Sequence, residues 1–397
     1  MTPEKLKKLQ YYYTFFNVFS VIVIVQNISI FFFPFLVRGL LQGGNKLLSK
    51  INAIDFFAII LGLGSILSVL STVGSSSFSN SIVVLPNYLY WIFLLILLPA
   101  YAKKLDYREI FRAVFWGIII SCTYFYTLND LLSQLIIFKD FQQNTFSFIL
   151  ICFSPIAVYY AQEKYGKVRA ILTAVAIVAA GAFSGSRSGS IITILTCFLT
   201  LYSNKINIVR VIGGAIIVFV IIPFLLQTSA VKSLIFGVNE RTYELIYAGQ
   251  EGLLRDESYL IRVAQVEKGI GLFKENPLTG IGLNNFSKHT YNISGDFEGS
   301  ELVMNIENLD QLSAHNSYIG LLAEGGILVF GPFVAILLFL FGYLIVKFKK
   351  IPDFQKPFFW GLLGMCIHLY FIMAIVNIFA WLLIALAASS LKYNSKK

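Results

Sequence analysis

The sequence Ser313-Ala-His-Asn-Ser-Tyr-Ile-Gly-Leu-Leu-Ala-Glu-Gly-Gly326 joins a long polar segment of this chain to a long apolar one. His315 lies at the join, and Glu324 lies within the apolar part beside two glycines. An ionisable residue at the edge of a bilayer is costly, and such residues usually serve a substrate path or a site. His315 is therefore the first candidate for chemistry. Glu324 is expected to be buried neutral or to pair with an arginine.

The composition indicates a membrane protein. Of the 397 residues, 57% are hydrophobic and only 13% are charged, which excludes an ordinary soluble domain. The apolar runs are long enough to cross a hydrocarbon core of about 30 Å as helices, and they lack the alternation that a lipid-facing barrel needs. We therefore predict an all-α, polytopic membrane helical bundle with about 11 to 12 transmembrane helices.

The predicted spans are the charge-free runs of the sequence. The first run can be one span or a bent pair of short helices broken near Gln26-Asn27. The pair is preferred because it keeps Lys5, Lys7 and Lys8 on the inner side. The runs cover residues 11–37, 56–73, 81–102, 113–129, 141–162, 170–184, 188–204, 211–226, 316–346, 358–376 and 378–391.

Charge divides the chain into three predicted parts. Residues 1–226 form the N-terminal transmembrane helices, residues 227–314 a large extracytoplasmic loop, and residues 315–397 the last three transmembrane helices. The loop holds 12 acidic against 7 basic residues, whereas the rest of the chain holds 24 basic against 9 acidic ones. Basic residues gather in short loops that stay in the cytoplasm, so the formal charge of +10 reports topology and a nucleic-acid partner is not expected.

The large loop contains one predicted helix. Apolar residues recur at helical spacing over residues 257–275, and the pair Asn276-Pro277 ends the pattern. Gly280-Ile-Gly282 then predicts a tight turn, and residues 296–310 form an acidic, turn-rich stretch.

Two arginines are candidates for holding an anion. Arg187 lies in Ser184-Gly-Ser-Arg-Ser-Gly189, a turn between two predicted spans on the outer side, and Arg262 lies in the predicted helix of the loop. Arginine offers a fixed fork of donors that suits phosphate oxygens. The alternative for Arg187 is a snorkelling loop residue, and that for Arg262 is a surface residue with a partly covered stem.

His315 has two interpretations as well. As a general base, an imidazole with a pKa near neutrality takes a proton from a hydroxyl group at working pH. As a structural residue, it caps the next helix, although Asn316 or Ser313 could supply that cap equally well. The four cysteines lie in apolar runs without metal-ligand spacing, so we predict neither a metal site nor a bound cofactor.

Several motifs together resemble the superfamily of O-antigen ligases and O-antigen polymerases. They are His315-Asn-Ser-Tyr-Ile-Gly-Leu-Leu-Ala-Glu-Gly-Gly326, Gly185-Ser-Arg-Ser-Gly189, and Arg262 followed by Asn276-Pro-Leu-Thr-Gly-Ile-Gly-Leu-Asn-Asn-Phe286. Members of that superfamily have about twelve membrane helices and one large periplasmic loop before the last three, as predicted here. The unclear first span and the acidic stretch at residues 296–310 depart from the pattern.

This resemblance implies a GT-C-like fold in the bacterial cytoplasmic membrane, with the active site on the outer face. It implies a metal-independent, inverting transfer of glycan from undecaprenyl diphosphate to a glycan or lipid acceptor. Arg187 and Arg262 would hold the diphosphate and His315 would activate the acceptor hydroxyl, with Arg241 and Asn316 as further substrate-binding candidates. Membrane lipids and a chain-length regulator are the other expected partners.

Two alternatives stay open at this point. No residue separates a polymerase of glycan repeats from a ligase, although polymerase is slightly favoured. A transporter or flippase of lipid-linked oligosaccharide should show related halves and broken helices or polar residues at mid-membrane. The ionisable residues here gather mostly at the predicted outer edge, which favours chemistry at the surface over transport.

Overall fold

The structure is a computed structural model that describes residues 53–100, 107–123, 125–126, 143–184, 186–203, 257–290, 313–375 and 377–394. All of its regular elements within these ranges are helices, which confirms the predicted all-α class. The runs predicted at residues 11–37 and 211–226, the acidic stretch at 296–310 and Arg241 lie outside the described residues.

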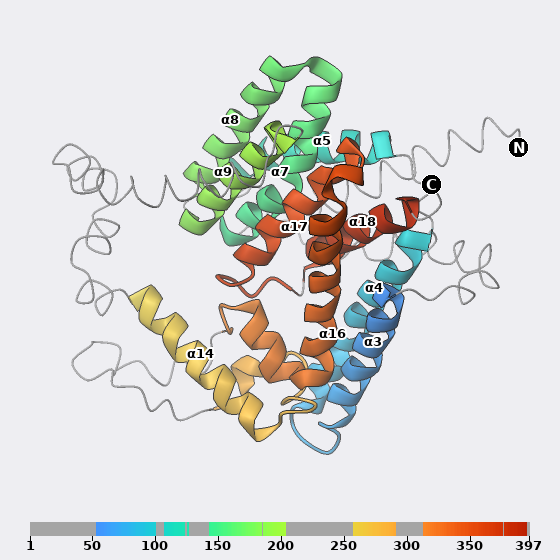
Figure 1. Ribbon diagram of the computed structural model, residues 1–397. Coiled ribbons are helices and arrows are strands. Elements are labelled where there is room, and N and C mark those ends of the chain that lie inside the picture. Colours follow the sequence, from blue (N-terminus) through green and yellow to red (C-terminus); the bar gives the residue numbers. More distant parts are fainter. Residues whose placement is uncertain are drawn as a thin grey trace, which may run out of the picture.

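The described helices follow the predicted apolar runs closely (Figure 1). Four of them, α3, α4, α7 and α16, are long and apolar enough to cross a membrane, and α9 and α18 are shorter apolar helices. The total of eleven to twelve spans stays a prediction. The helices are α3 (Ala53–Leu70), α4 (Phe78–Ala100), α5 (Tyr107–Thr123), α7 (Gln143–Tyr165), α8 (Lys167–Phe183), α9 (Arg187–Leu201), α14 (Glu257–Glu275), α16 (Ser317–Lys347), α17 (Lys356–His368) and α18 (Ile378–Asn394), with short 3-10 turns η5 (Phe286–Lys288), η7 (Phe348–Lys350) and η8 (Asp353–Gln355).

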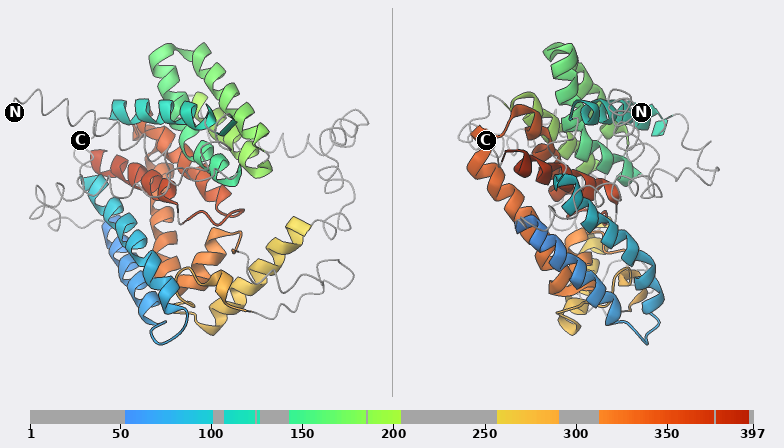
Figure 2. Two further views of the ribbon diagram at one scale, coloured as in Figure 1. Left: turned by 180° about the vertical axis from the view of Figure 1, so that it is seen from behind. Right: turned by 90° about the vertical axis from the view of Figure 1, so that its right-hand side faces the viewer.

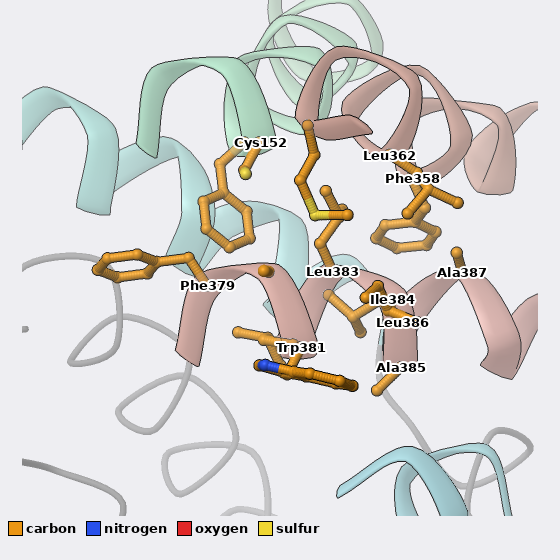
Figure 3. Packing of buried hydrophobic residues seen from close by; sticks show 14 of the residues in the cluster. Cys152, Phe358, Leu362, Phe379, Trp381, Leu383, Ile384, Ala385, Leu386 and Ala387 are labelled. Carbon is orange, nitrogen blue, oxygen red and sulfur yellow. The ribbon is translucent and has the colours of Figure 1, made fainter. Parts of the chain in front are cut away.

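Helix α7 forms the centre of one group of helices and packs against α5, α8, α9 and α17. In a second group, α16 runs alongside α3, which pairs with α4 (Figure 2). Helix α18 contacts both α4 and α7 and so joins the groups. Its Trp381 stacks on Trp91 of α4 with ring centroids 5.4 Å apart. Figure 3 shows Phe379 of α18, Cys152 of α7 and Phe358 of α17 in the same buried cluster.

Helix α17 ends at His368, eight residues before the end of the run predicted at residues 358–376. Residues 369–375 instead form turns, and buried turns need partners for their backbone polar groups. Ser317 supplies them, because its hydroxyl donates to the carbonyl of Ile372 at 2.7 Å and accepts from the nitrogen of Ala374 at 2.8 Å. The predicted span is therefore wrong over residues 369–375, and the start of α16 holds the end of α17.

Basic residues gather at one end of the described bundle. The α7–α8 turn, with Lys164 and Lys167, lies toward the top of Figure 1, as does the lysine-rich end of α16. The α3–α4 turn and α14 lie at the bottom. This separation matches the rule that basic residues crowd the cytoplasmic loops, with α14 at the opposite end.

Candidate active site

Helix α16 is broken at Gly326. The backbone of Gly326 has φ 58° and ψ −164°, which no helix contains, so residues 317–325 form a short helix and residues 327–347 a long one. Figure 1 shows the two parts running in different directions. The sequence predicted one continuous span over residues 316–346, which is wrong at this point. The break exposes carbonyl and amide groups that a continuous helix would have paired within itself.

The loop after α14 pairs with the backbone groups that the break exposes. The nitrogens of Ile281 and Gly282 donate to the carbonyls of Ala323 and Glu324, each at 3.0 Å. In the other direction, the nitrogens of Ile327 and Leu328 donate to the carbonyls of Pro277 and Leu278, at 2.9 and 3.2 Å. We call these four backbone hydrogen bonds the loop clamp. They join two motifs that lie about forty positions apart in the sequence.

Glycine is required on both sides of the loop clamp. A Cβ atom at Gly326 would overlap the carbonyl of Leu278, and one at Gly280 would overlap the backbone of Glu324. Both residues also have positive φ, which is costly for any other residue type. The tight turn predicted at Gly280-Ile-Gly282 is thus confirmed, and it serves to bring two backbones into contact.

Glu324 adds a side-chain bond to the loop clamp. Only 4% of the residue is exposed, and its Oε1 accepts from the backbone nitrogen of Phe286 at 3.0 Å. The carbonyl of Glu324 also accepts from the hydroxyl of Ser68 in α3 at 2.9 Å. The sequence correctly predicted that this carboxyl group is buried. Its described bonding partner is a backbone amide, which neither of the expected arrangements included.

Asn285 ties the same loop to the α3–α4 turn. Its amide nitrogen donates to the Ser81 hydroxyl at 2.7 Å and to the carbonyl of Ser77 at 3.2 Å, and its oxygen accepts from Asn80 at 3.1 Å. His289 lies 3.2 Å from the Ser77 hydroxyl. The loop is therefore held on two sides, by α16 and by the start of α4.

His315 lies just before α16 and is half-buried. Its φ of 45° is unusual for a residue with a side chain, and such conformations persist only where the surroundings fix them. Asn316 begins the helix, because its Oδ1 accepts from the nitrogens of Tyr318 and Ile319 at 3.0 and 3.2 Å. Of the capping residues proposed from the sequence, Asn316 is thus the one that acts, which leaves the His315 side chain for another role.

The positive charge of Arg262, on α14, affects the pKa of His315. Helix α14 packs against the short helix of α16, and Gly269 lies directly against Ile319. Burial lowers the pKa of His315 below its usual value, and the positive charge of Arg262 lowers that pKa further. Both effects favour the neutral imidazole, the form that accepts a proton. Two of the three residues proposed for the site, Arg262 and His315, thus lie on elements that pack against one another.

Arg187 is the first residue of α9, which Ser186 precedes as the N-cap. Its side chain lies outside the part of the chain that the structure describes. The turn around it is compact: the hydroxyls of Ser184 and Ser147 are 3.0 Å apart, and Ser190 donates to the carbonyl of Gly181 at 3.0 Å. Helix α9 packs against α17, whose end is bonded to the start of α16 through Ser317.

The comparison with protein families matches this part of the chain. Residues 172–334 match the family described as O-antigen ligase. This match supports the resemblance to the O-antigen ligase and polymerase superfamily that the sequence motifs indicated. No curated protein and no solved structure matches the chain.

The O-antigen ligase region begins in α8 and ends in the long part of α16, just beyond the break at Gly326. It therefore contains Arg187, Arg262 and His315, together with every residue of the loop clamp. Within this region, sequence reasoning missed the roles of Asn285 and Ser317. Each is an ordinary polar residue beside a helix end, and only the contacts distinguish it from a solvated one.

Proposed function

We propose that the chain is a membrane glycosyltransferase that uses undecaprenyl-diphosphate-linked glycan as its donor. It acts at the outer face of the bacterial cytoplasmic membrane, where it either polymerises O-antigen or capsule repeat units or ligates the glycan to an acceptor. The observation that carries this proposal is the packing of α14, which carries Arg262, against α16, which His315 precedes, inside the region that matches the O-antigen ligase family. This pair combines a proton acceptor with a cation that can hold the leaving phosphate.

In the proposed reaction, His315 takes the proton from an acceptor hydroxyl as its oxygen attacks the anomeric carbon of the donor sugar. The bond between that carbon and the diphosphate oxygen breaks, and its electron pair leaves with the diphosphate. Attack from the face opposite the leaving group inverts the anomeric centre. Arg262 and Arg187 stabilise the negative charge that develops on the departing diphosphate, so the transfer needs neither a metal ion nor a cofactor.

The substrate-binding roles of Asn316 and Arg241 belong to this proposal. The Oδ1 of Asn316 is occupied by the cap of α16, so a contact with the acceptor would come from its amide nitrogen. Arg241 lies in the loop before α14, outside the described residues, and would add a third cation toward the diphosphate. A chain-length regulator would bind elsewhere on the membrane domain.

Polymerases and ligases of this superfamily would share the donor, the leaving group and the base. They differ only in the acceptor, which is a second lipid-linked glycan in one case and a lipid core in the other. The proposed site residues do not distinguish between these two acceptors. The acceptor therefore has to be found by experiment.

The second candidate is a transporter of lipid-linked oligosaccharide, and the break in α16 favours it, because broken helices are a feature of transporters. In transporters, however, the exposed backbone groups of a broken helix line the substrate path at mid-membrane. Here the loop clamp pairs four of these groups, and the break lies at the end of the bundle that carries α14. The break thus has a structural use that does not involve transport.

The experiment that separates the two candidates is a transfer assay in detergent, where transport has no meaning. Purified protein would be incubated with lipid-linked glycan, with and without a lipid-core acceptor and a chelator. We expect a ladder of longer glycans or a ligated acceptor, unchanged by the chelator and absent with His315→Ala. If the wild-type protein forms no product from either acceptor, the transferase proposal is wrong.

A further inference from the structure

We infer that Glu324 is a positioning residue of the proposed transferase: by tying the loop after α14 to the broken end of α16, it sets the distance between Arg262 and His315. This inference rests on the proposed function, since it concerns how that site is held together. Glu324 touches neither donor nor acceptor in this account. Its effect reaches the reaction only through the two residues that it holds in place.

The argument begins with the connectivity of the loop clamp. Arg262 is carried by α14, and the loop that follows α14 directly enters the clamp at Pro277. His315 precedes the short helix of α16, and that short helix ends in the clamp at Gly326. The two site residues are thus on two arms that meet at one junction. Any change in how the arms meet alters the spacing of Arg262 and His315.

Glu324 lies in that junction and bonds to residues of two other segments. Its carbonyl takes part in the clamp by accepting from Gly282, and the same carbonyl accepts from Ser68 of α3. Its carboxylate reaches past the clamp to the nitrogen of Phe286, at the start of η5. One residue therefore connects the short helix, the loop and α3. None of the other bonds in the clamp involves a side chain.

The side chain of Glu324 also supplies the acceptor for a buried backbone group of the loop, the nitrogen of Phe286. A buried amide without an acceptor costs about 1 to 3 kcal/mol. Phe286 is buried, as is Asn285 beside it. Truncation of Glu324 leaves the nitrogen of Phe286 without this partner. The loop then relaxes from α16, and α14 moves with it.

The test measures the pH dependence of transfer, a readout that a general loss of stability does not move. Arg262 lowers the pKa of His315, so the fall in rate on the acid side reports whether the two residues are still close. We expect Glu324→Ala to reduce kcat/KM by about 100-fold, the scale of a misplaced catalytic group. The part of the pH profile where the rate falls on the acid side is its acid limb. We also expect Glu324→Ala to move the acid limb to higher pH, the same change that we expect for Arg262→Gln.

The double variant Arg262→Gln/Glu324→Ala gives the decisive comparison. If Glu324 acts through Arg262, the double variant has the same acid limb as Arg262→Gln alone. Glu324→Gln keeps an oxygen that accepts from Phe286 and should restore most of the wild-type profile. Glu109→Ala is the matched control, because it removes a buried carboxyl group from α5, outside the loop clamp. The acid limb of the control should stay at the wild-type pH.

Failure of this inference differs from failure of the proposed function. If Arg262→Gln moves the acid limb and Glu324→Ala leaves it in place, Glu324 does not position the site, and the transferase proposal stands. If the wild-type protein makes no product at any pH, the proposed function itself fails. Where Glu324→Ala does not fold, Glu324→Asp replaces it in the same measurement, because it draws the carboxylate back from Phe286 by one methylene group. Glu324→Asp should then move the acid limb as well, and an unmoved limb would reject the inference.

Discussion

The carboxylate of Glu324 accepts a hydrogen bond of 3.0 Å from the backbone nitrogen of Phe286, 38 positions earlier in the chain. This bond joins the end of one sequence motif to the end of another. The two motifs therefore form one structural unit, built from the loop after α14 and the broken start of α16. The residues proposed for catalysis, Arg262 and His315, lie on the two arms of that unit.

Replacement of His315 should abolish transfer. Loss of a general base costs about 10² to 10⁴-fold in rate. We therefore expect the transfer rate of His315→Ala in the detergent assay to be lower than that of the wild type by at least about 10²-fold. His315→Asn should lose as much, and asparagine tolerates the left-handed backbone of this position. His289→Ala is the control, because His289 lies in the same loop and bonds to Ser77. Full activity of both His315 variants would contradict the proposed role of the imidazole.

The helices of the bundle were largely predictable from the sequence, because apolar length alone specifies a span. The limits of α3, α7 and α18 agree with the predicted runs to within a few residues. The errors fall where the backbone leaves the helix inside an apolar run. Neither the break at Gly326 nor the early end of α17 changes the hydropathy, since glycine and the residues after His368 are as apolar as their neighbours.

The candidate site was predictable only in its residue types. A lone histidine at the join of polar and apolar segments and arginines in outer segments suggested His315, Arg262 and Arg187. The placement of Arg262 relative to His315 depends on the loop clamp, in which all four bonds are between backbone atoms and so are not specified by polar side chains. The glycines are the visible sign of that contact. At Gly326 the partner is the backbone of the loop after α14.

Arg262 should control the pH range of the reaction. The base must be neutral to accept a proton, so the rate falls as the pH drops through the pKa of His315. Burial and the charge of Arg262 both lower that pKa, which keeps the wild-type protein active on the acid side. Arg262→Gln removes the charge, and the acid limb should move to higher pH. Arg262→Lys keeps the charge and should keep the limb, while KM rises because lysine lacks the paired donors for phosphate. An unmoved limb in Arg262→Gln would show that the pair does not act in the reaction.

Replacement of Gly326 should destabilise the protein. Alanine at this position has the wrong backbone conformation and overlaps the carbonyl of Leu278, so we expect a loss of about 2 kcal/mol or more. Gly342→Ala in the long part of α16 is the matched control, since no atom lies within 4 Å of its added Cβ. Alanine suits a helix better than glycine, and the control should be unchanged or slightly more stable. Thermal unfolding in detergent measures both, and equal melting temperatures would contradict the broken helix.

Asn316 should matter for stability through its cap. Asn316→Ala removes the acceptor for the nitrogens of Tyr318 and Ile319, at a cost of about 1 kcal/mol. Asn316→Asp keeps that acceptor and should unfold at the wild-type temperature. If Asn316→Asp nevertheless loses transfer activity, the amide nitrogen contacts substrate as proposed. Retention of both stability and activity would limit Asn316 to the cap.

Arg187 should be required for use of the donor. Arg187→Ala removes a cation proposed to hold the diphosphate, and the transfer rate should fall by about 10² to 10³-fold, as for other groups that stabilise developing charge. Arg169→Ala is the control. Arg169 lies beside Tyr165 near the start of α8, whereas the turn that leads to Arg187 follows the other end of α8. Expression and melting temperature should be unchanged in both. Equal rates for the two variants would remove Arg187 from the site.

The anchorage of the loop after α14 by backbone atoms has a consequence for how such enzymes diversify. No side chain of residues 277–282 takes part in the four bonds that hold the loop, and the glycines are restricted by their close contacts. In the proposed transferase, substitutions at the exposed Pro277 and Leu278 would therefore change the surface near the glycan while the backbone bonds beneath them stay in place.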